Sequence, residues 1–546
     1  MAPKTDLSPR EELLRLQKRI FVHNDTFIRS QALVPEKGFE RYEKEYKKRV
    51  RSYKKVSNQE ELIEAILESD LIYVGDYHTN QQSQRTLLRL LKLLTDRGAR
   101  LAVGLELVLK RYQTHLDAYW EDKISEKIFL ERIRFKKHWY FDLWQNFKPI
   151  FDFAKFHKIP LFGVEYALGG NASLEKRDRE SAKCIASLVQ QEPGRKLLIF
   201  VGDLHIAPTH LPQSVQTELD KKKIQKKRLI LYQNSETIYW ELADEGIEDH
   251  VEIVRLSDSE FCITNTPPIV WQQSYLNWLE HEEDSIDYAD AKHSFAELVR
   301  RIAQFLEIPP TQNFEEDLEE VEVFTCGDLS FLKKVSQDES FSPTEIQRIK
   351  KQILASESYC IPQKKYVYLA NISLNHAAEE AAHYLKHLCS GLEEPRDPVD
   401  AFYANALHEA LGFFGSKIIN HKRKCFHEKE YLGLVSYLTS GKAPRGRKTE
   451  LEMALLILKA RELDKKGVPI RSKRFYRGQN DLFFGVTHGL GYMLGDRLYY
   501  ALLEERITKE EIRKVFGDPM KEKGEPFNLY KRLLRKIRGV RIPKRV

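Results

Sequence analysis

The chain has 546 residues, of which 42% are hydrophobic and 31% are charged, and its formal net charge is +7 at pH 7. This length exceeds what one hydrophobic core organises, so two or three domains are expected. No apolar run approaches the roughly 18 residues that a membrane span needs, which excludes a transmembrane helix. The basic residues form separate clusters without interleaved aromatic side chains, so we expect no nucleic-acid partner.

The start of the chain is strongly charged. Residues 1–55 are rich in Lys, Arg and Glu, which predicts a helical basic arm. They contain neither the apolar core of a signal peptide nor a cysteine for lipid attachment. The six cysteines of the chain are scattered and form no Cys-x-x-Cys pair, which is typical of reduced thiols. We therefore expect a cytoplasmic protein.

Two copies of one four-residue phrase each follow a short apolar run. Residues 71–74 lead into Gly75-Asp76-Tyr77-His78, and residues 197–201 lead into Gly202-Asp203-Leu204-His205. Each run predicts a buried strand, and the glycine allows a sharp turn directly after it. Because this composition yields about one Gly-x-x-His by chance, the shared context carries the prediction. An aspartate and a histidine are thus expected twice at one edge of a sheet.

Between the two phrases the sequence alternates strand and helix patterns. Short apolar runs at 101–103 and 160–162 are followed by Gly-Leu-Glu and Gly-Val-Glu, which bring Glu106 and Glu165 to the same edge. A helical pattern at 84–94 separates the first strands, and this alternation predicts an α/β fold, a parallel sheet with flanking helices. Three later runs complete the sheet, at 229–232, 251–256 and 261–264.

The second half of the chain is mainly helical in pattern. We expect an α/β domain over 56–280, a linker or connector over 281–340 and a mainly α-helical C-terminal domain over 341–546. One predicted helix places His376, Glu380, His383 and His387 on a single face, where either a metal site or close helix packing explains them. A third Gly-x-x-His, Gly485 to His488, lies in a glycine-rich helical segment that indicates helix packing, and the nearby His421, Cys425 and His427 are interpreted as structural.

The strand-end residues form a mixed nitrogen and oxygen donor set. Such a set suits a divalent metal, Zn, Mn, Co or Fe, with a position left for water. The ion would lower the pKa of that water, and Glu106 or Glu165 would take its proton. Arg177 and Arg179 are either an exposed helix start or groups that stabilise an oxyanion. The predicted metal ligands are His78, His205, Glu106, Asp76 and Asp203, with the two aspartates alternatively orienting the histidines.

This layout resembles the ChaN-like haem-binding family of the Tiki, TraB and erythromycin-esterase-like superfamily. The resemblance covers about residues 65–270 and is carried by the two Gly-x-x-His phrases, Gly104-Leu105-Glu106 and the segment from Trp139 to Leu161. It implies an α/β core in which His78, Glu106 and His205 form the functional centre.

Three functions are consistent with these residues. The first is a metal-dependent hydrolase-like activity on an ester or peptide bond of a small-molecule or peptide substrate, with His78, His205, Glu106 and Glu165 as catalytic residues. The second is haem or iron binding for uptake or storage, with Tyr77 and Tyr166 among the cofactor contacts in an aromatic layer that includes Trp139 and Tyr140. The third is an interaction scaffold with a degenerate site.

Overall fold

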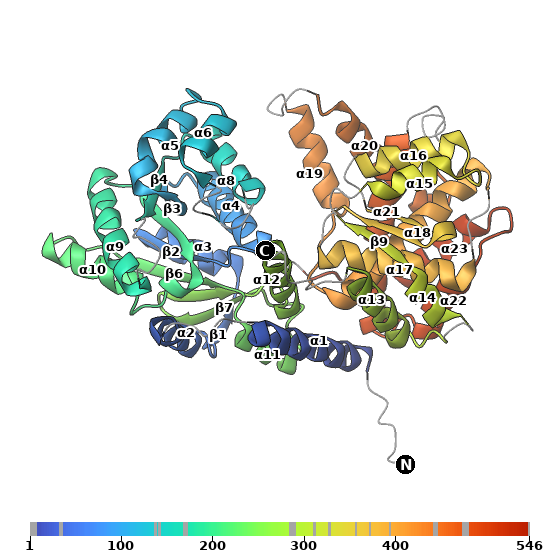
Figure 1. The fold of residues 1–546 in the computed structure, drawn as a ribbon, viewed down its shortest axis with the longest axis horizontal. Coiled ribbons are helices and arrows are strands. Elements are labelled where there is room, and N and C mark those ends of the chain that lie inside the picture. Colours follow the sequence, from blue (N-terminus) through green and yellow to red (C-terminus); the bar gives the residue numbers. More distant parts are fainter. Residues whose placement is uncertain are drawn as a thin grey trace, which may run out of the picture. The chain divides into compact units, whose positions relative to one another are not determined.

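The computed structural model (Figure 1) describes residues 8–543 apart from 32–36, 136–138, 140–143, 167–172, 283–290, 310–312, 326–328, 355–357, 371–372, 392–394, 441–445 and 472–479. The chain divides into two compact units. The α/β unit comprises Phe21–Ile286 and Pro543–Val546, and the helical unit comprises Met1–Ile20 and Asp287–Ile542. None of the helices in the described ranges combines the length and apolar character that crossing a membrane requires.

The described part of the α/β unit contains an eight-stranded sheet with the strand order β1-β7-β8-β6-β2-β5-β3-β4. The six strands from β8 to β4 run parallel, and β7 and β1 add an antiparallel edge. This confirms the predicted α/β class. The strands are β1 (Lys55–Ser57), β2 (Leu71–Asp76), β3 (Leu101–Leu109), β4 (Leu161–Glu165), β5 (Lys196–Gly202), β6 (Arg228–Gln233), β7 (Ile253–Ser257) and β8 (Glu260–Ile263).

Helices cover both faces of this sheet because successive side chains of each strand point to opposite faces. In β2, Ile72 and Val74 join a core with α3, α4 and α8, whereas Leu71 and Tyr73 join a core with α9, α10 and α11. The helices and 3₁₀ turns of the unit are α1 (Pro9–Gln31, which extends into both units), α2 (Lys37–Arg49), α3 (Gln59–Leu67), α4 (Gln81–Asp96), η1 (Lys110–Tyr112), α5 (Gln113–Trp120), α6 (Glu126–Arg132), α8 (Trp144–Phe156), α9 (Leu174–Gln191), η2 (Asp203–His205), α10 (Leu211–Lys221), α11 (Glu236–Glu245) and α12 (Pro268–Glu282).

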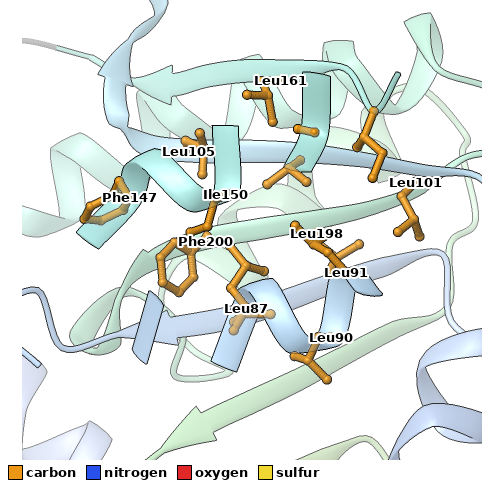
Figure 2. Close-up of a cluster of buried hydrophobic side chains, with 14 of the residues drawn as sticks. Leu87, Leu90, Leu91, Leu101, Leu105, Phe147, Ile150, Leu161, Leu198 and Phe200 are labelled. Atoms are coloured by element: carbon orange, nitrogen blue, oxygen red, sulfur yellow. The ribbon is translucent and has the colours of Figure 1, made fainter. Parts of the chain in front are cut away.

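The first of these cores holds the strands that carry the candidate site. Leucines of α4 at helical spacing meet Phe147 and Ile150 of α8 over β3 and β5 (Figure 2). The aromatic segment between β3 and β4 belongs to this core, because Phe129, Trp144 and Phe151 are buried in the same cluster. The sheet edge that bears the site is therefore supported by close-packed apolar side chains.

Truncation of this core is expected to destabilise the α/β unit. Leu91 is fully buried against the sheet, so Leu91→Ala removes apolar contacts and leaves a cavity. The free energy of unfolding should fall by about 2–5 kcal/mol. Denaturant unfolding monitored by circular dichroism measures this change, and a loss near zero would contradict the packing described.

The helical unit is built around α18, which packs against both α17 and α21. A three-stranded sheet of order β10-β11-β9 lies in the same unit. Its elements are α13 (Ala291–Phe305), α14 (Phe314–Glu320), β9 (Glu322–Thr325), α15 (Ser330–Gln337), α16 (Pro343–Leu354), β10 (Tyr359–Ile361), η3 (Pro362–Lys364), β11 (Tyr366–Leu369), α17 (Leu374–Ser390), α18 (Pro398–Ile419), α19 (Glu428–Thr439), α20 (Lys448–Lys466), α21 (Asn480–Leu503), α22 (Lys509–Gly517) and α23 (Glu525–Lys536).

The segment expected to be a connector, residues 281–340, is folded where it is described. It forms α13, α14, β9 and α15, and Phe295, Val299 and Ile302 of α13 are fully buried. The charged run at 315–320 led to the prediction of a connector. The packing of this segment instead depends on the apolar residues at helical spacing in α13.

Candidate functional site

The two Gly-x-x-His phrases lie on neighbouring strands. Parallel pairing of β2 with β5 places Asp76 beside Gly202, so His78 and His205 follow adjacent strand ends. Next to β5 lie β3, with Glu106, and then β4, which ends at Glu165. The carboxyl ends of neighbouring parallel strands are where α/β sheets commonly bind ligands.

Glu106 lies inside β3 rather than after it, because the strand continues to Leu109. The pairing of β3 with β5 ends at Leu105, and its register with β4 shifts between Leu105 and Leu109. Irregularities of this kind redirect side chains next to functional sites. Here the irregularity coincides with the position of Glu106, which reaches the backbone N–H of Gly202 at 2.6 Å.

His78, Glu106 and His205 approach one another next to Gly202. A Cβ atom built on Gly202 would lie 3.3 Å from His78 Nε2, 3.4 Å from Glu106 Oε2 and 3.6 Å from His205 Cδ2. Both imidazoles and the carboxylate therefore surround the space that the missing side chain leaves. We call these three residues the strand-end triad.

Each imidazole is held by a carboxylate at one nitrogen and approaches Glu106 with the other. His78 Nδ1 lies 2.8 Å from Asp76 Oδ2, and His205 Nδ1 hydrogen-bonds to Asp178. The Nε2 atoms of His78 and His205 lie 3.8 and 4.0 Å from the two oxygens of Glu106. A carboxylate that accepts Nδ1–H fixes the tautomer with the lone pair on Nε2, as in many metal-ligating histidines.

The two orienting carboxylates are themselves hydrogen-bonded. Asp76 Oδ1 accepts from Gln84 Nε2, and Asp178 Oδ2 accepts from the hydroxyl of Tyr42 at 2.9 Å. Both oxygens of Asp76 are thus engaged. The contact between Asp76 Oδ2 and His78 Nδ1 has the geometry of the orienting role predicted for Asp76.

A buried ion-pair network links the triad to Glu165. Arg177 of α9 donates from Nη2 to Glu106 and from Nε to Glu165, each at 2.8 Å. Arg179, two residues along, is exposed and pairs with Glu175. Of the two arginines considered from the sequence, only Arg177 contacts the site.

The charges in this network give Glu106 and Glu165 different pKa values. Burial raises the pKa of Glu106, but the charges of His78 and His205 outweigh burial and lower that pKa to about 2. Burial also raises the pKa of Glu165, and the nearby Glu106 adds to the increase. Glu106 therefore remains a carboxylate, whereas Glu165 is the group that accepts a proton more readily.

Burial disfavours the charged form of both imidazoles, yet the carboxylates around them prevail. Asp76 and Glu106 raise the pKa of His78 to about 9. Asp178 and Glu106 likewise raise the pKa of His205. A cation that bound at Nε2 would displace these protons.

Asp203, predicted as a metal ligand, lies behind the triad against Gly75. A Cβ on Gly75 would lie 1.9 Å from Asp203 Oδ1, which explains why only glycine fits there. In the described part of the chain this buried oxygen has no hydrogen-bond partner. Burial, with the nearby Asp76, raises the pKa of Asp203 to about 8. Without a cation nearby, this raised pKa favours the protonated carboxyl, and the ligand role of Asp203 stays a prediction.

Of the aromatic residues considered from the sequence, Trp139 contacts His78, whereas Tyr77 packs elsewhere and Tyr166 is exposed. Tyr77 packs against Trp271 of α12, with ring centroids 5.2 Å apart, and Tyr166 is exposed. Trp139 meets the ring of His78 edge-on at 5.0 Å. Tyr140 lies outside the described residues.

Sequence reasoning missed Asp178, although a signal was present. Asp178 stands between two arginines in a charged segment that looked exposed, yet it is 1% exposed. It precedes Ala182 and Ile185 by four and seven residues, which places it on the buried face of α9. A carboxylate on an apolar helix face needs a partner, and His205 supplies it.

We expect Asp178→Asn to weaken ligand binding by His205 without unfolding the chain. The amide keeps the shape of the side chain but no longer stabilises Nδ1–H as a carboxylate does. Loss of such an orienting group costs about 10–100-fold in metal affinity. Isothermal titration with Zn²⁺ measures it, and Asp220→Asn on the surface of α10 serves as the matched control.

Two other groups of possible metal ligands lie outside the strand-end triad. Within the described ranges, two groups bring three ligand atoms within 4.8 Å of one another, Cys425–His427–Asp496 and Glu379–Glu409–His488, and both lie in the helical unit. The strand-end triad is not among them, so its side chains would have to move closer together to hold an ion. Cys425 and His427, interpreted from the sequence as structural, thus lie beside Asp496, which also pairs with Lys417.

The fold and site define a mostly parallel α/β protein with a histidine and carboxylate centre at the carboxyl ends of adjacent strands. Residues 62–168 match the family model described as "Haem-binding uptake, Tiki superfamily, ChaN", which confirms the predicted ChaN-like relationship over that segment. The matched segment contains His78, Glu106 and Glu165 but not His205 or the helical unit.

One solved structure matches part of the chain. The structure "Cofacial heme binding to ChaN of Campylobacter jejuni" is 14% identical, and the match covers 33% of this chain and 88% of that chain with a TM-score of 0.25. No curated protein matches the chain.

Proposed function

We propose that the strand-end triad binds one divalent transition-metal ion and that the chain is a metal-dependent hydrolase of ester or peptide bonds. The observation that carries this proposal is the convergence of two carboxylate-held imidazoles on the two oxygens of Glu106. Two nitrogen donors and one carboxylate suit Zn, Mn, Co or Fe and leave a coordination position for water.

The chemistry divides between the ion and the residues around it. The ion supplies a water whose pKa is lowered towards about 7. Glu165 would be the group that accepts a proton during hydrolysis and returns it to the leaving oxygen or nitrogen. Arg177, which donates to both glutamates, would hold Glu106 and Glu165 in one orientation.

Kinetics on variants test this division of roles. Purified chain loaded with Zn²⁺ or Co²⁺ should cleave chromogenic esters or peptides, and Glu165→Gln should reduce kcat by about 10²–10⁴-fold with metal affinity retained. His78→Ala with His205→Ala should lose the metal and the activity together. Full turnover in Glu165→Gln would remove the assigned proton transfer.

Haem or iron binding is the second candidate, favoured by the description of the matched family. The side chain of His78 is 25% exposed and that of His205 only 8%, so His78 is the more accessible axial ligand, with Trp139 at its edge. Bound haem would supply redox or ligand-binding chemistry at its iron. Tyr77 and Tyr166 complete the predicted contacts.

Spectroscopy separates the two candidates. Haem added to the full chain should produce a Soret band that His78→Ala abolishes if the site binds haem. A Soret band unchanged in His78→Ala, together with metal-dependent cleavage in the unmodified chain, would favour hydrolysis.

A further inference from the structure

The helical unit contains a second group of metal-ligand side chains, at the contact of α17, α18 and α21. These helices approach closely because glycines face their neighbours. A Cβ on Gly415 of α18 would lie 2.4 Å from Ala382 Cβ of α17, and a Cβ on Gly491 of α21 would lie 2.7 Å from the carbonyl oxygen of Ala406 in α18. Side chains near these contacts therefore reach one another across all three helices.

One ligand atom from each helix meets the others. Glu379 of α17, Glu409 of α18 and His488 of α21 each offer an atom within 4.8 Å of the other two, and His488 Nδ1 lies 3.0 Å from Glu409 Oε2. Helix bundles build metal sites in this way, from inward side chains on facing helices. Ligands about 2.0–2.2 Å from an ion lie closer together than this limit, so only small side-chain adjustments are needed.

A second, independent observation comes from buried polar atoms beside the group. In the described residues, Glu380 Oε2, His383 Nε2 and His408 Nδ1 are buried without a hydrogen-bond partner. Glu380 and His383 are 5% and 6% exposed. Glu380 Oε2 lies 3.6 Å from His383 Nδ1, so the group beside the three ligands retains polar atoms that a water or an ion would satisfy.

His383 interacts electrostatically with two of the three ligands, Glu379 and Glu409. His383 follows Glu379 by four residues on α17, and its ring stacks on His408 of α18 with centroids 4.0 Å apart. Burial opposes the charge on His383, but Glu380, and after it Glu409 and Glu379, raise its pKa to about 9. The electrostatic influence of Glu379 and Glu409 on His383 places its ring near two of the three ligands.

Arg423 is the one guanidinium that contacts this group among the described residues. Its Nη2 lies 2.8 Å from Glu379 Oε2 and 2.8 Å from the hydroxyl of Tyr492. Arg423 pairs with Glu379, whereas Glu409 pairs with His488. An ion at Glu379 would therefore share this carboxylate with Arg423 and with the hydroxyl of Tyr492.

We propose that Glu379, Glu409 and His488 bind a divalent transition-metal ion, independently of the strand-end triad. Two carboxylates and one imidazole suit Mn²⁺, Fe²⁺, Co²⁺ or Zn²⁺. The half-exposed side chain of His488 provides the entry path, and Glu380 and His383 lie beside the ion to orient a ligand or complete its coordination.

A Co²⁺ titration of the full chain tests this site, with the background variant His78→Ala/His205→Ala removing the strand-end triad. This background should bind about one Co²⁺ per chain, seen in the visible absorption of the ion and by isothermal titration. Adding His488→Ala and Glu409→Gln should weaken that binding by about 100-fold or more. Glu510→Gln, on the surface of α22, is the matched control and should bind as the background does.

The chosen substitutions keep the result interpretable. His488 is half-exposed and Glu409→Gln preserves volume, whereas replacing Glu379 would leave Arg423 buried without its carboxylate. His488→Ala alone, with unchanged circular dichroism, should already weaken Co²⁺ binding. The proposal is overturned if the background binds no divalent ion, or if it binds equally well without His488 and Glu409. Neither result bears on the strand-end triad, which is judged from the difference between the unmodified chain and the background.

Discussion

Glu106→Gln is expected to lower metal affinity at the strand-end triad by about 100-fold or more and to abolish measurable turnover. The carboxylate faces both Nε2 atoms, and its negative charge is what offsets two imidazoles and a cation in a buried space. Glutamine keeps the shape and can still accept from the N–H of Gly202, but it removes that charge.

Isothermal titration with Zn²⁺ and a hydrolysis assay on the same preparation measure both effects. Glu175→Gln is the control, because Glu175 is an exposed glutamate at the start of α9 that pairs with Arg179. Equal Zn²⁺ affinity in Glu106→Gln and the unmodified chain would show that Glu106 is not a ligand.

Gly202→Ala is expected to block the triad while the chain stays folded. The added methyl group would occupy the point that His78, Glu106 and His205 surround, at 3.3–3.6 Å from their nearest atoms. The backbone tolerates alanine here, since φ of Gly202 is −51°. We expect a change in unfolding free energy of less than about 1.5 kcal/mol and a loss of metal affinity of about 100-fold.

A second glycine variant separates blocking from unfolding. Gly75→Ala would place a methyl group 1.9 Å from Asp203 Oδ1, so it should destabilise the α/β unit by about 1–3 kcal/mol. Gly433→Ala, with no atom within 4 Å of the added Cβ, should leave metal binding unchanged. Thermal unfolding and Zn²⁺ titration of the three variants distinguish these outcomes. Unimpaired metal binding in Gly202→Ala would contradict the position assigned to the ion.

The sequence allowed the α/β class and the strand-end residues to be predicted because both depend on local patterns. Short apolar runs ending in glycine identified β2 and β5, and parallel strands have their carboxyl ends at one edge. The order of the strands was not predictable in this way. That β5 lies between β2 and β3, and so joins the two Gly-x-x-His phrases, follows from long-range pairing.

The parts that sequence reasoning missed involve contacts between distant segments. Asp178 and Arg177 lie more than 70 residues from Glu106 or His78, and their charged neighbourhood resembles an exposed helix start. Asp178 instead lies on the buried face of α9, where it meets His205. In the helical unit, His488 was interpreted as part of a packing segment; the glycines do pack closely, and the same close packing brings His488 to Glu409.

The metal content of the purified chain tests the central claim most directly. Inductively coupled plasma mass spectrometry should find about one transition-metal ion per chain more in the unmodified protein than in His78→Ala/His205→Ala, both prepared under the same conditions. Any ion held in the helical unit contributes equally to both samples. Equal metal content in the two proteins would contradict the strand-end metal site.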